Sequence, residues 1–139
     1  MKLVVASDEK TELTDFVLEY LESKGHDLIL LGDLVEKNGK WVEIGMEAGK
    51  MVAEGKVDGG VIFCWSGTGV TMAANRIKGA RAALCWTPQI AQLARKWDDA
   101  NILVMALVDT TKETAHEILN VWFATNFDEE GLNEAHKLG

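Results

Sequence analysis

Residues 61–75 of the chain read VIFCWSGTGVTMAAN. The apolar run over residues 61–64 is typical of a buried strand, and Cys64 is its last residue. Gly67 and Gly69 follow at once and indicate a tight loop, and the next helix is predicted to begin at Thr68 or at Thr71. The fold to which this stretch belongs is indicated by the pattern on either side of it.

Short apolar runs separated by longer segments of helical period extend over the rest of the chain. Strands are predicted over residues 2–6, 28–31, 61–64, 80–84 and 102–106. Helices are predicted over residues 13–24, 43–54 and 89–96, and from a capping box at Thr110 and Glu113 to Phe123, while the polar residues 33–41 predict a loop. This alternation predicts an α/β fold with a doubly wound parallel sheet of five strands. We expect one domain over residues 1–139, with 128–139 as a polar tail.

The composition is that of an ordinary globular domain, with 139 residues, 47% of them hydrophobic, and a net charge of −8. This acidic balance is unfavourable for nucleic-acid binding, which needs a basic face. No apolar run approaches the roughly 20 residues that span a bilayer, and the N-terminus turns polar at Ser7. Two cysteines without a secretory signal predict a reduced, cytoplasmic protein, and their spacing is not that of a metal site.

Cys64 has two interpretations. A cysteine in a buried strand is most often a small core residue. In a doubly wound sheet, however, ligands bind beyond the carboxyl ends of the strands, and Cys64 lies at such an end. The amides of the glycine loop and of the helix start would favour an anion and the thiolate form. A thiolate there is suited to act as a nucleophile or as a base toward carbon.

Asp8 follows the first predicted strand and also has two interpretations. It is either a capping or first-turn acid of the next helix, or a carboxylate that hydrogen-bonds a sugar hydroxyl in the cleft. Asp98 and Asp99, before the fifth strand, belong either to a solvated turn or to a polyol site. Cys85 has no glycine-rich or charged neighbours in the sequence and is interpreted as structural.

Motifs along almost the whole chain carry a family resemblance. They are Ala6-Ser7-Asp8, Lys24-Gly25-His26, Asp58-Gly59-Gly60-Val61-Ile62-Phe63-Cys64, Ser66-Gly67-Thr68-Gly69, Ala73-Ala74-Asn75, Gly79-Ala80-Arg81-Ala82-Ala83-Leu84-Cys85 and Asp99-Ala100-Asn101-Ile102-Leu103. On these motifs, residues 1–127 resemble the type B ribose-5-phosphate isomerases and the two subunits of galactose-6-phosphate isomerase. The resemblance implies a three-layer α/β/α Rossmann-like domain. It also implies a homodimer or a dimer of dimers in which each site is completed by the partner subunit.

The chemistry that the resemblance implies is the isomerisation of an aldose to a ketose through a cis-enediolate, without a metal or a cofactor. Cys64 falls on the base that moves a proton between C1 and C2. Ser66 falls on the hydroxyl that assists ring opening or hydrogen-bonds the open sugar. Gly67 and Gly69 belong to the amide loop that stabilises the enediolate oxygen. Val70 stands where some members have a glutamate, which favours the cysteine as base.

The chain also departs from the family pattern, mainly at positions of positive charge. Glu9 replaces a histidine, Trp97-Asp98 replaces His-Asn, and Val108 replaces an arginine. The tail contains Lys137 but none of the arginines that reach the partner's substrate phosphate. Because a phosphate dianion needs paired cationic donors, these changes predict a different sugar, with a smaller or absent phosphate.

The expected site contains two catalytic and eight substrate-binding residues. The catalytic residues are Cys64 and Ser66, and the binding residues are Asp8, Glu9, Trp65, Gly67, Thr68, Gly69, Trp97 and Asp98. Trp65 and Trp97 either stack on the sugar or pack in the dimer interface. The default substrate pair of the family is ribose 5-phosphate and ribulose 5-phosphate. A non-catalytic sugar- or metabolite-binding protein is the alternative function, and a thiol redox protein is a third that the absence of a C-x-x-C motif disfavours.

Overall fold

The computed structural model describes residues 1–35 and 39–139, with 131–133 described by their backbone alone. Five parallel strands form one sheet in the order β2-β1-β3-β5-β4. Their bounds are β1 Lys2–Ser7, β2 Asp27–Gly32, β3 Gly59–Cys64, β4 Ala82–Leu84 and β5 Ile102–Ala106. The predicted parallel α/β sheet of five strands is therefore confirmed.

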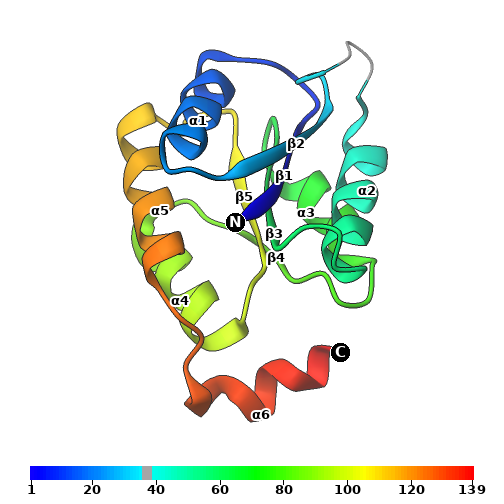
Figure 1. Ribbon diagram of the computed structural model, residues 1–139, viewed down its shortest axis with the longest axis vertical. Coiled ribbons are helices and arrows are strands. Elements are labelled where there is room, and N and C mark those ends of the chain that lie inside the picture. Colours follow the sequence, from blue (N-terminus) through cyan, green and yellow to red (C-terminus); the bar gives the residue numbers. More distant parts are fainter. Residues whose placement is uncertain (36–38) are drawn as a thin grey trace.

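Helices cover both faces of this sheet and make a three-layer arrangement (Figure 1). One face carries α1 (Glu12–Ser23), α4 (Pro88–Asp98) and α5 (Lys112–Ala124), and the other carries α2 (Trp41–Ala53) and α3 (Thr68–Asn75). The tail contains the short helical segments η1 (Glu129–Gly131), α6 (Leu132–Ala135) and η2 (His136–Leu138). Among the described residues, no helix has the length and apolar character needed to cross a membrane.

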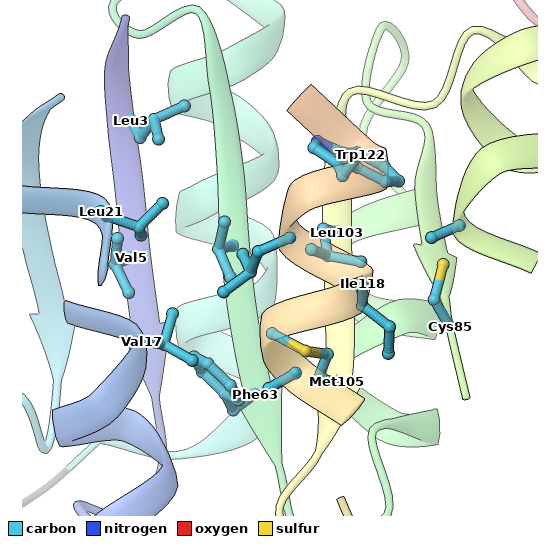
Figure 2. Close-up of a cluster of buried hydrophobic side chains, with 14 of the residues drawn as sticks. Leu3, Val5, Val17, Leu21, Phe63, Cys85, Leu103, Met105, Ile118 and Trp122 are labelled. Atoms are coloured by element: carbon cyan, nitrogen blue, oxygen red, sulfur yellow. The ribbon is translucent and has the colours of Figure 1, made fainter. Parts of the chain in front are cut away.

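Two apolar clusters, one on each face, hold the layers together. The larger cluster joins the strands to α1, α4 and α5. Figure 2 shows Phe63 of β3 beside Val17 of α1, and Leu103 and Met105 of β5 beneath α5, which carries Ile118 and Trp122. The central strands β3 and β5 are buried along their whole length. A parallel strand covered by helices on both faces needs this continuous apolar sequence, which explains why residues 61–64 and 102–106 were predictable as strands.

Several boundaries differ from the predictions by one or two residues, and at three of them the structure shows a local feature. β4 begins at Ala82 because Gly79, with φ of 98°, lies in a turn that is closed by the Ala80 N–H bonding to the Ile77 carbonyl at 3.0 Å. α5 is capped by Thr111, whose hydroxyl oxygen accepts the Thr114 N–H, so the predicted capping box at Thr110 and Glu113 is wrong by one residue. α2 begins at Trp41, inside the predicted loop over 33–41, and residues 36–38 of that loop lie outside the described residues.

The strand order reverses between β1 and β3. From β1 the chain moves outward to β2, returns to β3 on the other side of β1, continues to β4 at the far edge, and comes back to β5 between β3 and β4. Ser7 pairs with Phe63 at the carboxyl ends of these two strands. In sheets of this kind the crevice at such a reversal is where ligands bind. It is the region in which the sequence places both Asp8 and Cys64.

Candidate active site

A cavity of about 350 Å³ opens at the carboxyl ends of β1 and β3. It brings together side chains from the loop after β1, the end of β3, the first turns of α3 and the start of α2. The residues that line it are Asp8, Trp41, Cys64, Trp65, Ser66, Thr68, Gly69 and Met72. Six of the ten expected site residues therefore lie around one cavity, namely Asp8, Cys64, Trp65, Ser66, Thr68 and Gly69.

Cys64 is the last residue of β3 and is 5% exposed. It packs in the apolar cluster beneath α2 and α3 and also lines the cavity. The loop behind it is held by an extension of β5, because Leu107 donates its N–H to the Cys64 carbonyl at 3.0 Å and Val108 donates to the Trp65 carbonyl at 2.9 Å. The thiol is therefore a core residue by packing and a cavity residue by position.

The glycine loop turns the chain directly into α3. Gly67 caps the helix with φ of 77°, in the left-handed region, and a Cβ built on it would lie 2.5 Å from Leu84 Cδ1. Only glycine fits this position without strain. The Thr71 hydroxyl donates to the Gly67 carbonyl at 2.6 Å, and α3 begins at Thr68 and not at Thr71.

The first turn of α3 supplies hydrogen-bond donors at the cavity. The amides at the start of a helix have no intrahelical acceptors, and the helix dipole favours negative charge there. Ser66 Oγ accepts the Thr68 N–H at 3.3 Å and lies 2.7 Å from the Thr68 hydroxyl. No acidic side chain occupies this first turn. The position is therefore suited to hold an oxyanion of a ligand.

Asp8 is half-buried at the cavity and does not cap α1. Thr11 is the N-cap, and its side chain forms a capping box with Thr14. The interpretation of Asp8 as a capping acid is therefore wrong. Burial raises the pKa of the Asp8 carboxyl above its ordinary value, and the nearby charges of Glu9 and Asp33 raise it further. Asp8 remains available to a ligand in the cavity.

Four expected site residues lie outside the cavity lining. Gly67 is buried directly behind it, as the N-cap of α3. Glu9 is exposed beside Asp8, and its backbone N–H and carbonyl are both hydrogen-bonded to the Ser7 hydroxyl. Trp97 and Asp98 end α4, which precedes β5, so they lie at the amino end of the sheet. Asp98 borders a different cavity, of about 520 Å³.

Two residues of the cavity, Trp41 and Met72, were not expected from the sequence. Met72 belongs to α3, and Trp41 belongs to α2, so neither helix position is adjacent to Cys64 along the chain. A Cβ built on Gly69 would lie only 2.8 Å from Trp41 Cε3. Gly69 was the one available signal, because a glycine at the start of a helix is compatible with the close approach of another group.

Cys85 lies on the opposite face of the sheet from Cys64. It is buried in the cluster under α4 and α5, and Figure 2 shows it near Met105 and Ile118. Burial raises the pKa of the Cys85 thiol to about 12, and its Sγ lies 3.5 Å from the Ala83 carbonyl oxygen. Because the two thiols pack in separate layers, the fold does not favour a redox pair between them.

Known proteins are similar to the chain over most of its length. The family model described as Ribose/Galactose Isomerase matches residues 3–138. Ribose-5-phosphate isomerase B of Escherichia coli (strain K12) is 30% identical over 112 residues, which are 81% of this chain and 75% of that protein.

Solved structures extend the match to the whole fold. A ribose 5-phosphate isomerase from Thermotoga maritima superposes with a TM-score of 0.90 and 32% identity, over 99% of this chain and 96% of that one. Ribose-5-phosphate isomerase B from Mycoplasma genitalium, with bound ribulose-5-phosphate, superposes with a TM-score of 0.89 and 28% identity, over 99% of this chain and 93% of that one. The chain therefore belongs to the Ribose/Galactose Isomerase family of sugar-phosphate aldose–ketose isomerases.

Proposed function

We propose that this cavity isomerises an aldose and a ketose through a cis-enediolate, with Cys64 as the base. The observation that carries the proposal is that one cavity is lined by the thiol, the Ser66 hydroxyl, the Asp8 carboxylate and the first turn of α3. The default substrate pair, by similarity to the relatives, is ribose 5-phosphate and ribulose 5-phosphate. The expected location is the cytoplasm, on the basis of composition.

The chemical problem is the low acidity of a proton on the carbon next to a carbonyl. The Cys64 thiolate takes the proton from C2 of the open aldose, and the electron pair moves onto the carbonyl oxygen at C1 to give the enediolate. The same thiol returns the proton to C1 while the hydroxyl proton moves from O2 to O1, so the ketose forms without net loss of atoms. A positioned base contributes about 10²–10⁴-fold and an oxyanion donor about 10²–10³-fold.

The remaining groups hold the sugar and the charge. Amides at the start of α3 are placed to stabilise the enediolate oxygen, as the helix N-terminus favours negative charge. Ser66 assists ring opening or hydrogen-bonds the open chain, and Asp8 accepts hydrogen bonds from sugar hydroxyls. These roles follow the family resemblance, and they agree with the presence of all these groups around one cavity.

The charge of the cavity bears on the substrate. Among the described residues that line it, Asp8 is the one charged side chain, and none is a lysine or an arginine. Glu9 and Asp33 add negative charge close to Asp8. A phosphate dianion bound by this chain alone would lack paired cationic donors. This supports a sugar with a smaller or absent phosphate, unless a partner subunit supplies the donors.

A partner subunit is part of the proposal. Trp97 and Asp98 lie at the amino end of the sheet, and they reach a cavity like this one only from a second copy of the chain. We therefore propose a homodimer or a dimer of dimers with the site at the subunit interface. Mixing Cys64→Ala subunits with subunits that carry both Trp97→Ala and Asp98→Ala should restore activity to mixed dimers. Mixing without recovery would contradict the shared site.

The deciding experiment is proton exchange measured by NMR in D₂O. The wild-type chain should exchange deuterium into C1 or C2 of its substrate, and Cys64→Ala should abolish this exchange while ligand binding remains. The panel is D-ribose 5-phosphate, D-galactose 6-phosphate and the unphosphorylated D-ribose and D-galactose. Binding of a sugar without exchange would favour the alternative of a non-catalytic binding protein, which the substitutions at Glu9, Trp97 and Val108 support.

A further inference from the structure

Trp41 begins α2 on the face of that helix that packs against α3. Gly45 and Gly49 follow at intervals of four residues and therefore share this face. A Cβ on Gly45 would lie 2.8 Å from the Val70 carbonyl oxygen, and one on Gly49 would lie 2.9 Å from the Ala74 carbonyl oxygen. The two helices are thus in backbone contact, and this contact fixes the direction in which Trp41 points.

The indole of Trp41 packs on the first turn of α3. A Cβ built on Gly69 would lie 2.8, 3.0 and 3.2 Å from Cε3, Cδ2 and Cζ3 of Trp41. Gly69 has no left-handed φ, so its backbone does not require glycine. What the missing side chain provides is room for the aromatic ring. The ring therefore lies beside the first turn of α3, whose residues Thr68 and Gly69 line the cavity.

The contact leaves much of the indole uncovered at the cavity. Trp41 remains 43% exposed and lines the same cavity as Cys64. Trp65, which is 60% exposed, lines it as well. The remaining lining offers a carboxylate and two hydroxyls, from Asp8, Ser66 and Thr68. The cavity thus combines flat apolar surface with hydrogen-bonding groups.

A sugar has matching surfaces, because its C–H bonds form apolar faces and its hydroxyls hydrogen-bond at the edges. Aromatic rings give a large and rigid contact area for such an apolar face. We propose that Trp41 is a specificity-determining residue, whose indole receives the C–H face of the sugar's carbon chain. This inference rests on the proposed function of the cavity as a sugar site. It concerns the carbon chain and not a phosphate group.

The test compares Trp41→Ala and Trp41→Phe with Trp86→Ala as a matched control. Trp86 is 45% exposed, close to the value for Trp41, but it does not line the cavity. Trp41→Ala should raise KM about tenfold with kcat within about threefold, because a stacking contact is lost and the reacting groups remain. Trp41→Phe should recover most of the affinity, and Trp86→Ala should leave KM unchanged. Circular dichroism and the Tm of each variant establish that it is folded.

A second readout separates a contact to the carbon chain from other effects. In Trp41→Ala, KM should rise by the same factor for D-ribose 5-phosphate and for D-ribose. Where binding is measured instead, the ligand-induced thermal shift should fall by the same factor for both sugars. Thermal shifts are taken relative to each variant's own Tm, so that a general loss of stability does not count. Should Trp41→Ala fail to fold, Trp41→Leu keeps apolar volume without a flat ring and should show the same loss.

The possible results are distinct. An unchanged KM in Trp41→Ala, with an active wild type, overturns this inference alone. A fall in kcat at constant KM in both Trp41 variants also overturns it, since that result indicates a purely structural role. A wild-type chain that neither binds nor converts any sugar of the panel overturns the proposed function and this inference together.

Discussion

The hydroxyl groups of Ser66 and Thr68 lie 2.7 Å apart at the wall of the cavity, and Ser66 Oγ also accepts the Thr68 N–H. Ser66 is therefore oriented by the first residue of α3. We predict that Ser66→Ala lowers kcat about 10–100-fold, because it removes a hydroxyl that helps to move protons during ring opening or enolisation. Steady-state kinetics on the sugar that proves to be the substrate would measure the effect.

The matched control for Ser66 is Thr68→Val, which keeps the shape of the side chain and removes its hydroxyl. If the hydroxyl of Thr68 serves mainly to orient Ser66, kcat should fall by no more than about threefold. An equal loss in both variants would mean that the hydroxyl pair acts as a unit and that Ser66 has no separate role.

Asp8 is predicted to reduce stability in exchange for ligand binding. Its folded pKa is raised, mainly by burial and then by Glu9 and Asp33, so the protonated form is favoured in the folded state. The contribution of this group to the free energy of unfolding is complete below the pKa that it has in the unfolded state. It is lost as the pH rises through the higher pKa that it has in the folded state. Asp8→Asn should therefore unfold at higher urea concentration than wild type at pH 7, with a difference that shrinks in acid. The same variant should bind the sugar more weakly.

The control for Asp8 is Asp15→Asn, because Asp15 is exposed and pairs with Lys10 at 2.6 Å. That variant should show no gain in stability at pH 7, since a solvent-exposed pair contributes little. A stability gain in Asp8→Asn that does not change with pH would show that the titration of Asp8 is not its cause.

Cys85 should resist alkylation in the native protein. Burial raises its pKa to about 12, so almost no thiolate forms at pH 8. Treatment with iodoacetamide followed by mass spectrometry should show Cys64 modified first, and Cys85 modified only after denaturation. A ligand that fills the cavity should slow the modification of Cys64 alone. Rapid native modification of Cys85 would contradict its place in the core.

The raised pKa of Cys85 also predicts a loss of stability in base. The folded state keeps the proton while the unfolded state, with a pKa near 9, releases it. The contribution to stability is therefore complete below pH 9 and is lost as pH rises from 9 toward 12. Cys85→Ala should show a flatter dependence over this interval in urea unfolding, whatever its stability at neutral pH. An identical slope in both proteins would contradict the prediction.

The sequence predicted the elements whose pattern is local. Residues 102–106 are buried on both faces and were predicted at their observed bounds, and the glycine loop correctly indicated a strand followed by a helix. The position of Asp8 and Cys64 at one edge followed from the parallel sheet. These features depend on residues within a few positions of one another.

Local sequence patterns did not predict the contacts between segments that are distant along the chain. In the sheet, β5 lies between β3 and the edge strand β4. This order depends on how whole strands pair, and no short motif encodes it. Trp41 reaches the cavity because α2 packs closely on α3, and this packing is visible only when both helices are in place. Trp97 and Asp98 were expected to bind substrate, and within one chain they lie at the amino end of the sheet, outside the lining of the cavity that contains Cys64.

The close contact between Trp41 and Gly69 leads to a final prediction about stability. In the wild-type background, Gly69→Ala introduces a methyl group where the indole lies at 2.8 Å, and such overpacking costs about 1–3 kcal/mol. In the Trp41→Ala background the space is vacant, and alanine is favoured over glycine inside a helix by about 0.5–1 kcal/mol. Gly69→Ala should then be neutral or stabilising. Urea unfolding of the four proteins gives the coupling between the two positions, which should exceed about 1 kcal/mol. Equal costs in both backgrounds would mean that the indole does not occupy this place in solution.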